Sequence, residues 1–122
     1  ALMAVRAIRG AIQLDQDERS HLLKSTAELV TKVLHENQLD VADLISIWFT
    51  ATPDLVSEFP ALAARELGLG DVPLMCSVEM AVAGSMPRVI RLMMHANTDL
   101  SRSEIKHVYL RGAVNLRSDL AQ

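Results

Sequence analysis

Residues 44–51 read Leu-Ile-Ser-Ile-Trp-Phe-Thr-Ala, a nearly continuous run of residues that favour β-structure. Such a run is typical of a strand whose two faces are both covered. Thr52-Pro53-Asp54 follows directly, and a proline in this position ends the strand. Upstream, residues 15–37 carry apolar side chains at spacings of three and four, which predicts a helix with one buried stripe. We expect Asp15 or Asp17 to cap the start of this helix.

The remaining segments add further strands and one short helix. We expect a strand at Val5–Leu14, a helix at Pro60–Leu67, a strand at Val72–Val82, a turn at residues 83–85 and a strand at Val89–Ala96. Ser101 and Glu104 resemble a capping box, so residues 105–110 could continue a helix or form a strand, and periodicity weakly favours the helix. This order predicts one domain over residues 1–122, an α/β (α+β) fold with a mixed β-sheet flanked by helices. Few helices would leave one face of the sheet uncovered, and a homo-oligomer could cover it.

The composition excludes several classes of protein. The chain has 122 residues, half of them hydrophobic, a net charge of −3 and no long basic run, which argues against nucleic acid as a partner. No apolar run approaches the roughly 20 residues that span a bilayer, so we expect no membrane association. Cys76 is the only cysteine, which suits a reducing cytoplasm. The four histidines show no metal-type pairing and no phosphate-binding glycine loop occurs, so we expect no metal and no cofactor.

Arginine is the informative charged residue, with nine copies against three lysines. Four arginines lie among apolar residues: Arg9, Arg65, Arg91 and Arg111. A charge within a segment made for burial is unfavourable unless something pairs it, and each arginine alone could be a structural ion pair or an edge residue. Several together indicate a site for a multiply charged anion.

Cys76 and Glu79 lie on the same expected strand, three residues apart. That odd spacing puts them on opposite faces of a regular strand, so a bulge or strand end would be needed to aim both into one pocket. Taken alone, Cys76 reads as a small buried residue and Glu79 as a solvent-facing charge.

In combination, these segments resemble the AroH class of monofunctional chorismate mutases from about Val5 to Leu120. The order and spacing of the matching pieces carry the resemblance, and the pieces are Arg6–Ala11, Thr50–Leu55, Phe59–Ala61, Ala64–Leu67, Val72–Cys76, Glu79–Met80, Ile90–Met94, Asn97–Asp99, His107–Leu110 and Leu116–Leu120. The resemblance implies a trimeric pseudo-α/β-barrel with sites between subunits, and a strand at His107–Leu110. It implies the cofactor-free rearrangement of chorismate to prephenate in phenylalanine and tyrosine biosynthesis.

The resemblance also implies the site residues. The catalytic set is Arg91, Glu79 and Cys76, and the substrate-binding set is Arg9, Phe59, Ala61, Arg65, Leu74, Met75, Tyr109, Leu116 and Arg117. Arg91 would stabilise negative charge on the ether oxygen, and Glu79 would accept a hydrogen bond from the ring hydroxyl, with Cys76 beside it as an environment residue and not a nucleophile. Leu62 stands where relatives often carry a charge at the mouth of the site, and Met75 where a relative has a small polar residue.

Two other functions fit a small trimer with clustered arginines. A Rid-type imine hydrolase has a similar size and also uses an arginine to bind a carboxylate of its ligand. A non-catalytic ligand-binding trimer would use the same residues without turnover. The arginines together with Glu79 and Cys76 favour the mutase over the hydrolase.

Overall fold

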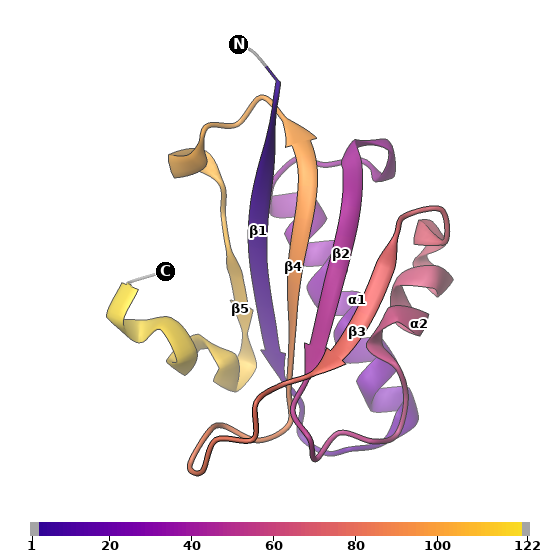
Figure 1. The fold of residues 1–122 in the computed structure, drawn as a ribbon, viewed down its shortest axis with the longest axis vertical. Coiled ribbons are helices and arrows are strands. Elements are labelled where there is room, and N and C mark those ends of the chain that lie inside the picture. The colour runs from indigo at the N-terminus through magenta and orange to yellow at the C-terminus, as the bar shows by residue number, and fades with distance from the viewer. Residues whose placement is uncertain (1–2, 121–122) are drawn as a thin grey trace.

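The computed structural model describes residues 3–120, and beyond Leu116 it describes the backbone alone. Its centre is one five-stranded mixed sheet in the order β3-β2-β4-β1-β5 (Figure 1). The strands are β1 (Ala4–Gln13), β2 (Leu44–Ala51), β3 (Leu74–Val78), β4 (Val89–Thr98) and β5 (Val108–Leu110). Central strand β4 runs antiparallel to β1 and β2, whereas β5 is parallel to β1 and β3 is parallel to β2. The expected mixed α+β sheet is confirmed.

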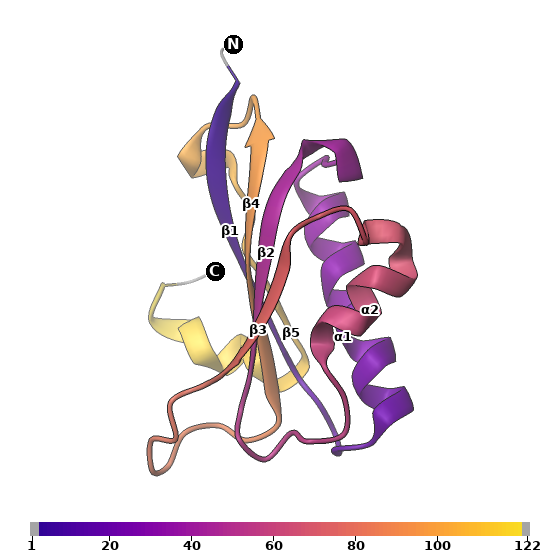
Figure 2. The same cartoon turned by 45° about the vertical axis from the view of Figure 1, so that its right-hand side comes forward.

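Both helices lie on the same face of this sheet, as Figure 2 shows. They are α1 (Arg19–Glu36) and α2 (Pro60–Ala64). Three short helical segments join the strands, η1 (Val41–Asp43), η2 (Arg65–Leu69) and η3 (Arg102–Glu104), and η4 (Arg111–Leu120) follows β5. We call the sheet face away from α1 and α2 the open face; η4 packs over one end of it.

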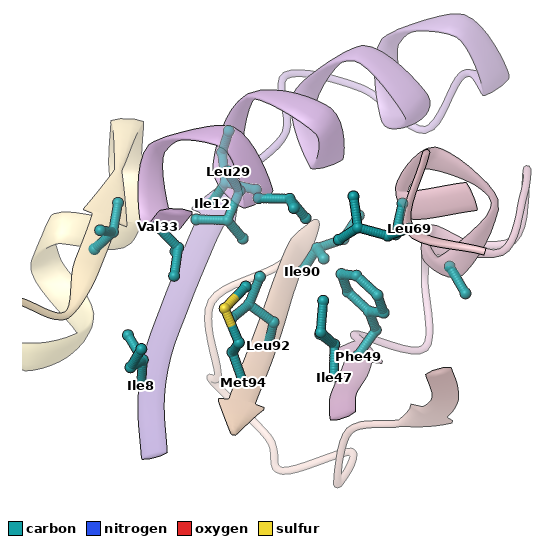
Figure 3. Close-up of a cluster of buried hydrophobic side chains, with 14 of the residues drawn as sticks. Ile8, Ile12, Leu29, Val33, Ile47, Phe49, Leu69, Ile90, Leu92 and Met94 are labelled. Carbon is teal, nitrogen blue, oxygen red and sulfur yellow. The ribbon is translucent and has the colours of Figure 1, made fainter. Parts of the chain in front are cut away.

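The core lies between the sheet and α1 (Figure 3). Alternate residues of β1, β2 and β4 point into it, because strand side chains alternate between faces. The fully buried members include Ile8, Ile12, Leu29, Val33, Ile47, Phe49, Ile90 and Met94. Gly10 lets α1 approach β1 closely: a Cβ there would lie 3.2 Å from the side chains of Leu29, Val33 and Leu92.

Two helices differ from expectation at their ends. The first begins at Arg19, and its cap is Glu18, which accepts the backbone N–H groups of Ser20 and His21. Neither Asp15 nor Asp17 caps it, because the Asp17 carboxylate instead accepts backbone N–H groups from the loop before α2. The second helix stops at Ala64 and widens into η2, where Gly68 takes a positive φ of 95°.

Strand lengths also differ from expectation. The strand expected at Val72–Val82 covers only Leu74–Val78, because its partner β2 ends at Ala51, opposite Val78. Residues 108–110 form the strand that the resemblance implied and not the helix that periodicity weakly favoured, since they pair with Gly10–Ile12 on the free edge of β1. The capping box of Ser101 and Glu104 is present, but it starts only the short turn η3.

The open face carries the large apolar side chains that the single chain leaves uncovered. Val5, Trp48, Met75 and Met93 project from four different strands, and Trp48 is 48% exposed. The expectation that residues 44–51 are covered on both faces is therefore wrong within one chain, and the expectation of an uncovered sheet face is confirmed.

No helix within residues 3–120 is long and apolar enough to cross a membrane.

Asp17 fixes the loop before α2 against the start of α1. Its carboxylate accepts the N–H groups of Val56 at 3.0 Å and Ser57 at 3.2 Å. The Ser57 hydroxyl, together with these amides, lowers the pKa of Asp17 below its ordinary value of 3.8.

Replacing Asp17 by alanine should lower the free energy of unfolding at pH 7 by ~1 kcal/mol, since two partly solvated hydrogen bonds are lost. The folded-state pKa is the lower one, so this stability is present above the unfolded-state pKa of about 4 and is lost as the pH falls through the folded-state value. Urea unfolding of the parent protein and of Asp17→Ala, at pH 7 and near pH 3, measures the difference in their free energies of unfolding. A difference of equal size at both pH values would contradict this role of the carboxylate.

Candidate active site

One register row of the sheet crosses all five strands on the open face. Its members, from one edge to the other, are Tyr109, Ala11, Arg91, Thr50 and Ser77. Arg91 stands in the middle of this row because β4 is the central strand. Its neighbours Ala11 and Thr50 are short, so the guanidinium has room above the sheet. The Arg91 cation is therefore attached to a strand that is paired with a neighbouring strand on each side.

The cavity above this row has a volume of about 410 Å³. We call it the Arg91 cavity, and its polar lining is Arg9, Trp48, Thr50, Ser77, Glu79, Arg91 and Tyr109. Its size falls within the range of small-molecule sites, roughly 300–1,000 Å³. The sequence-based expectation brought Arg9, Glu79, Arg91 and Tyr109 into one site, and the structure places all four around this one cavity.

Glu79 reaches the open face because it follows the last residue of β3. Its backbone N–H donates to the carbonyl of Ala51 at 2.9 Å, so the β2–β3 pairing extends one step past the strand. The carboxylate accepts the hydroxyl hydrogen of Thr50, and its Oε2 lies 3.5 Å from Nε of Arg91. Thr50 thus orients Glu79, and Glu79 in turn faces Arg91.

The charge of the Arg91 cavity suits an anion. Arg9 is half-buried and forms no ion pair among the described side chains, those of residues 3–116, whereas Arg91 is paired with Glu79 and its side chain is still 45% exposed. Two guanidinium groups against one carboxylate leave a formal charge of +1 in a chain whose overall charge is −3. The Trp48 indole N–H donates to the Ser77 hydroxyl at 2.8 Å and forms one wall.

Other expected site residues lie elsewhere. Phe59 and Cys76 line a separate cavity of about 500 Å³, the Cys76 cavity, formed by residues 51–60 and 76–78. Cys76 pairs with Phe49, whose side chain is in the core, so it lies on the helix side of the sheet and Glu79 on the open face. The expectation that regular strand spacing separates the two residues is confirmed. Within one chain they line two different cavities.

Four further residues were expected near these sites. Ala61 is buried in the core, and Leu74 is half-buried against it. Arg65 is exposed at the end of α2, and Met75 is exposed on the open face beside Trp48. None of the four lines the Arg91 cavity.

The C-terminal segment packs near two lining residues of the Arg91 cavity, Ala11 and Tyr109, but does not itself line it. Leu116 packs with Tyr109 against a small apolar cluster of Ala11, Val89 and Ala113. Arg111, which was grouped with the anion-binding arginines on sequence grounds, points to α1 instead: it binds Glu28 at 2.9 Å and Ser25 at 3.0 Å. That grouping is wrong for Arg111. The side chain of Arg117 lies outside the described side chains.

Sequence reasoning missed Trp48, Thr50 and Ser77 as lining residues. Trp48 and Thr50 alternate with core residues on β2, which is a signal for the open face. Their place beside Arg91 depends on the β2–β4 register, which has an irregularity between Leu44 and Ser46. Among the side chains that the structure describes, those of residues 3–116, no group of three or more His, Cys, Asp or Glu could hold a metal ion.

The comparisons with known proteins agree with one another. The family model described as chorismate mutase type I matches residues 5–120. The chain is 46% identical to Chorismate mutase AroH of Thermus thermophilus over 117 residues, covering 95% of this chain and 96% of that protein. It is 42% identical to Chorismate mutase AroH of Bacillus subtilis over 120 residues, covering 98% of this chain and 94% of that protein. A solved chorismate mutase from Clostridium thermocellum superposes with a TM-score of 0.89 at 44% identity, covering 90% of this chain and 98% of that one.

Proposed function

The chain belongs to the family of type I chorismate mutases, and we propose that its Arg91 cavity binds chorismate and rearranges it to prephenate. The observation that carries this assignment is the convergence of Arg9, Glu79, Arg91 and Tyr109 on one cavity of suitable size and charge. The enzyme is an isomerase of aromatic amino acid biosynthesis. Loss of the ultraviolet absorbance of chorismate, followed with the purified protein, tests it directly. A Rid-type hydrolase or a non-catalytic binding protein would leave the absorbance unchanged.

The rearrangement requires no bond-making or proton transfer by the protein. Chorismate is a dianion, and its rearrangement breaks the ether C–O bond as a new C–C bond forms within the same molecule. No proton is transferred and no covalent intermediate is needed, so no cofactor and no metal have a part. The protein accelerates the reaction by holding the folded, chair-like conformer and by stabilising the negative charge that builds on the ether oxygen.

Arg91 supplies that charge stabilisation. It is a permanent cation at the centre of the sheet, with paired strands on both sides, so its guanidinium needs little reorganisation in the transition state. Glu79 keeps the guanidinium in place and accepts a hydrogen bond from the ring hydroxyl of chorismate. Thr50 acts through Glu79 as a positioning residue. Arg9 and Tyr109 hold a carboxylate of the substrate.

A neighbouring copy of the chain completes the site. Phe59, Arg65 and Cys76 do not line the Arg91 cavity of their own chain, which supports a site that they enter from another subunit. The uncovered apolar residues of the open face support the same assembly, since burial of such a surface drives association. We therefore assign the protein as a homotrimer with its sites between subunits, in which Phe59, Ala61, Leu74 and Met75 help to shape an apolar wall. Leu116 and Arg117 belong to the proposed substrate-binding set, and we place the enzyme in the cytoplasm.

Replacing Arg91 by alanine should lower kcat far more than it raises KM, because the lost interaction forms mainly in the transition state. Loss of one preorganised donor typically lowers the rate by about 10²–10³-fold, and a full cation accounts for at least that much. Arg91→Lys should recover only part of the rate, since the ammonium keeps the charge but loses the planar fork. Steady-state kinetics and thermal melts of both variants measure this. Lys32→Ala, on the outer face of α1, is the matched control for loss of a cation. A folded Arg91→Ala protein with normal kcat would exclude the proposed role.

Thr50→Val should lower kcat by about 10-fold or more, since a hydrogen bond to a charged group contributes roughly 1.5–3 kcal/mol. Thr50→Ser keeps the hydroxyl and should retain most of the turnover. A positioning role predicts that Thr50→Val lowers kcat without changing the melting temperature, and that Thr50→Ser keeps kcat near that of the parent protein. If Thr50→Val lowers only the melting temperature, Thr50 has a structural role alone.

Two variants that each impair one half of the site should restore each other's activity if each site takes residues from two subunits. Arg91→Ala removes one half of the site and Arg65→Ala the other. In randomly mixed trimers, about a quarter of the sites pair an intact Arg91 half with an intact Arg65 half. Co-expression of the two chains, followed by the absorbance assay and light scattering, should show regained activity in a trimer. Activity no greater than that of the separate variants would argue against shared sites.

A further inference from the structure

Strand β5 carries Tyr109 into the Arg91 cavity with little support of its own. It has three residues, it lies at the edge of the sheet, and it pairs with β1 alone (Figure 1). Of the three, only Val108 is buried, while Tyr109 and Leu110 are half-buried. A strand this short, paired on one side, opens easily unless its ends are held. The core holds it before Tyr109, so the question is what holds it after Tyr109.

Arg111, the residue directly after β5, joins the end of this strand to α1. Its Nη2 donates to the carboxylate of Glu28 at 2.9 Å, and its Nη1 donates to the hydroxyl of Ser25 at 3.0 Å. Ser25 and Glu28 are three residues apart on α1, so they share one helix face and the planar guanidinium reaches both. These contacts lie within one chain and on the helix side of the sheet. They therefore do not depend on what covers the open face.

The backbone at Arg111 has a conformation that requires such an anchor. Its φ is 55°, in the left-handed region that residues other than glycine adopt only at a cost in energy. The next residue, Gly112, lies against the side chain of Gln13, and a Cβ at Gly112 would overlap the Gln13 amide oxygen. Gln13 in turn donates from Nε2 to the carbonyl of Pro87 at 3.1 Å. The turn at residues 111–112 is thus fixed between α1 and the end of β1.

We propose that Arg111 is a positioning residue that acts through Tyr109. Val108 is packed in the core before Tyr109, and Arg111 is bound to α1 after it, so the phenol is held between two fixed points. Arg111 itself does not line the Arg91 cavity, whereas Tyr109 does. The inference rests on the proposed function, in which Tyr109 holds a carboxylate of chorismate. Since a displacement of about 1 Å can lower activity by up to about 100-fold, the anchor contributes to substrate affinity from outside the cavity.

Steady-state kinetics with chorismate distinguish this role from that of a structural ion pair. Arg111→Ala should raise KM by about tenfold and lower kcat by less than about threefold, because a misplaced Tyr109 weakens binding and leaves Arg91 in place. Arg111→Lys keeps the cation beside Glu28 and should recover part of the affinity. Glu28→Gln keeps an oxygen acceptor for the guanidinium and should raise KM less than Arg111→Ala does. A lower melting temperature with unchanged KM in all three variants would overturn the proposal.

Lys32→Ala is the matched control for loss of a cation. Lys32 lies one turn beyond Glu28 on α1 and pairs with Glu36, so it belongs to the same surface but does not join β5 to the helix. Because an exposed pair of this kind contributes little, KM should change by less than about twofold. A rise in KM equal to that of Arg111→Ala would assign the effect to the charge of the surface and not to the anchor.

The double variant Tyr109→Phe/Arg111→Ala tests whether the effect passes through the tyrosine. If it does, KM of the double variant should lie within about twofold of KM for Tyr109→Phe alone, since the hydroxyl that Arg111 positions is already absent. Independent effects that multiply in the double variant would show that Arg111 acts through another part of the site, such as the C-terminal segment. That result would overturn the proposal.

Fluorine NMR reports on Tyr109 without any need for activity. The chain contains one tyrosine, so 3-fluorotyrosine labels this position alone. We expect one narrow signal in the parent protein and in Lys32→Ala, and a shifted or broadened signal in Arg111→Ala as the phenol samples other positions. An unchanged signal in Arg111→Ala would overturn the proposal. A changed signal in a protein without mutase activity would retain the anchor and refute the proposed function, so the two failures are distinguishable.

Discussion

The alternation of side chains along β4 is the constraint on which the rest of the structure depends. Ile90, Leu92 and Met94 enter the core against α1, and Arg91 and Met93 therefore face the other way. Because β4 pairs with β1 on one side and β2 on the other, its register sets which residues of all three strands share a face. A slip of one residue would bury Arg91 beneath α1 and expose three core side chains. The burial that stabilises the fold thus also holds the Arg91 cation in place.

The same alternation explains why one chain does not bring all the expected site residues together. Cys76 is on the helix side of β3, in register with Phe49, while Glu79 passes the end of the strand and reaches the open face. A sheet covered by helices on one face alone leaves the other face apolar and exposed. In the proposed homotrimer, joining the two halves of the site across a subunit boundary would cover this face. Assembly and activity would then depend on one surface, and a change in Trp48 or Met93 would affect both.

Two cavities side by side on the open face differ in how their charge is balanced. In the Arg91 cavity, Glu79 offsets part of the positive charge and is itself oriented by Thr50. The second cavity, which Arg6, Arg9 and Arg102 line, has no carboxylate among its described lining residues, and Arg6 donates from Nε to the carbonyl of Leu100. Arg9 lines both cavities, which share residues of β1 and β4.

The sequence by itself determined the helix stripe of residues 22–33, the family, and strands at Val5–Leu14, 44–51 and Val89–Ala96, which the structure shifts or extends by only one or two residues. Periodicity and motif order are local properties of the chain. It also determined that Cys76 and Glu79 face opposite ways, because strand spacing alone requires that. Only the tertiary structure decided that Glu18 and not Asp15 or Asp17 caps α1, that residues 108–110 pair with β1 at Gly10–Ile12 and that Arg111 pairs with Glu28. Each of these depends on a partner distant in sequence: the loop at Val56 and Ser57, the edge of β1 and the surface of α1. Local preference does not encode such partners, so the place of Thr50, Trp48 and Ser77 beside Arg91 followed only from the sheet register.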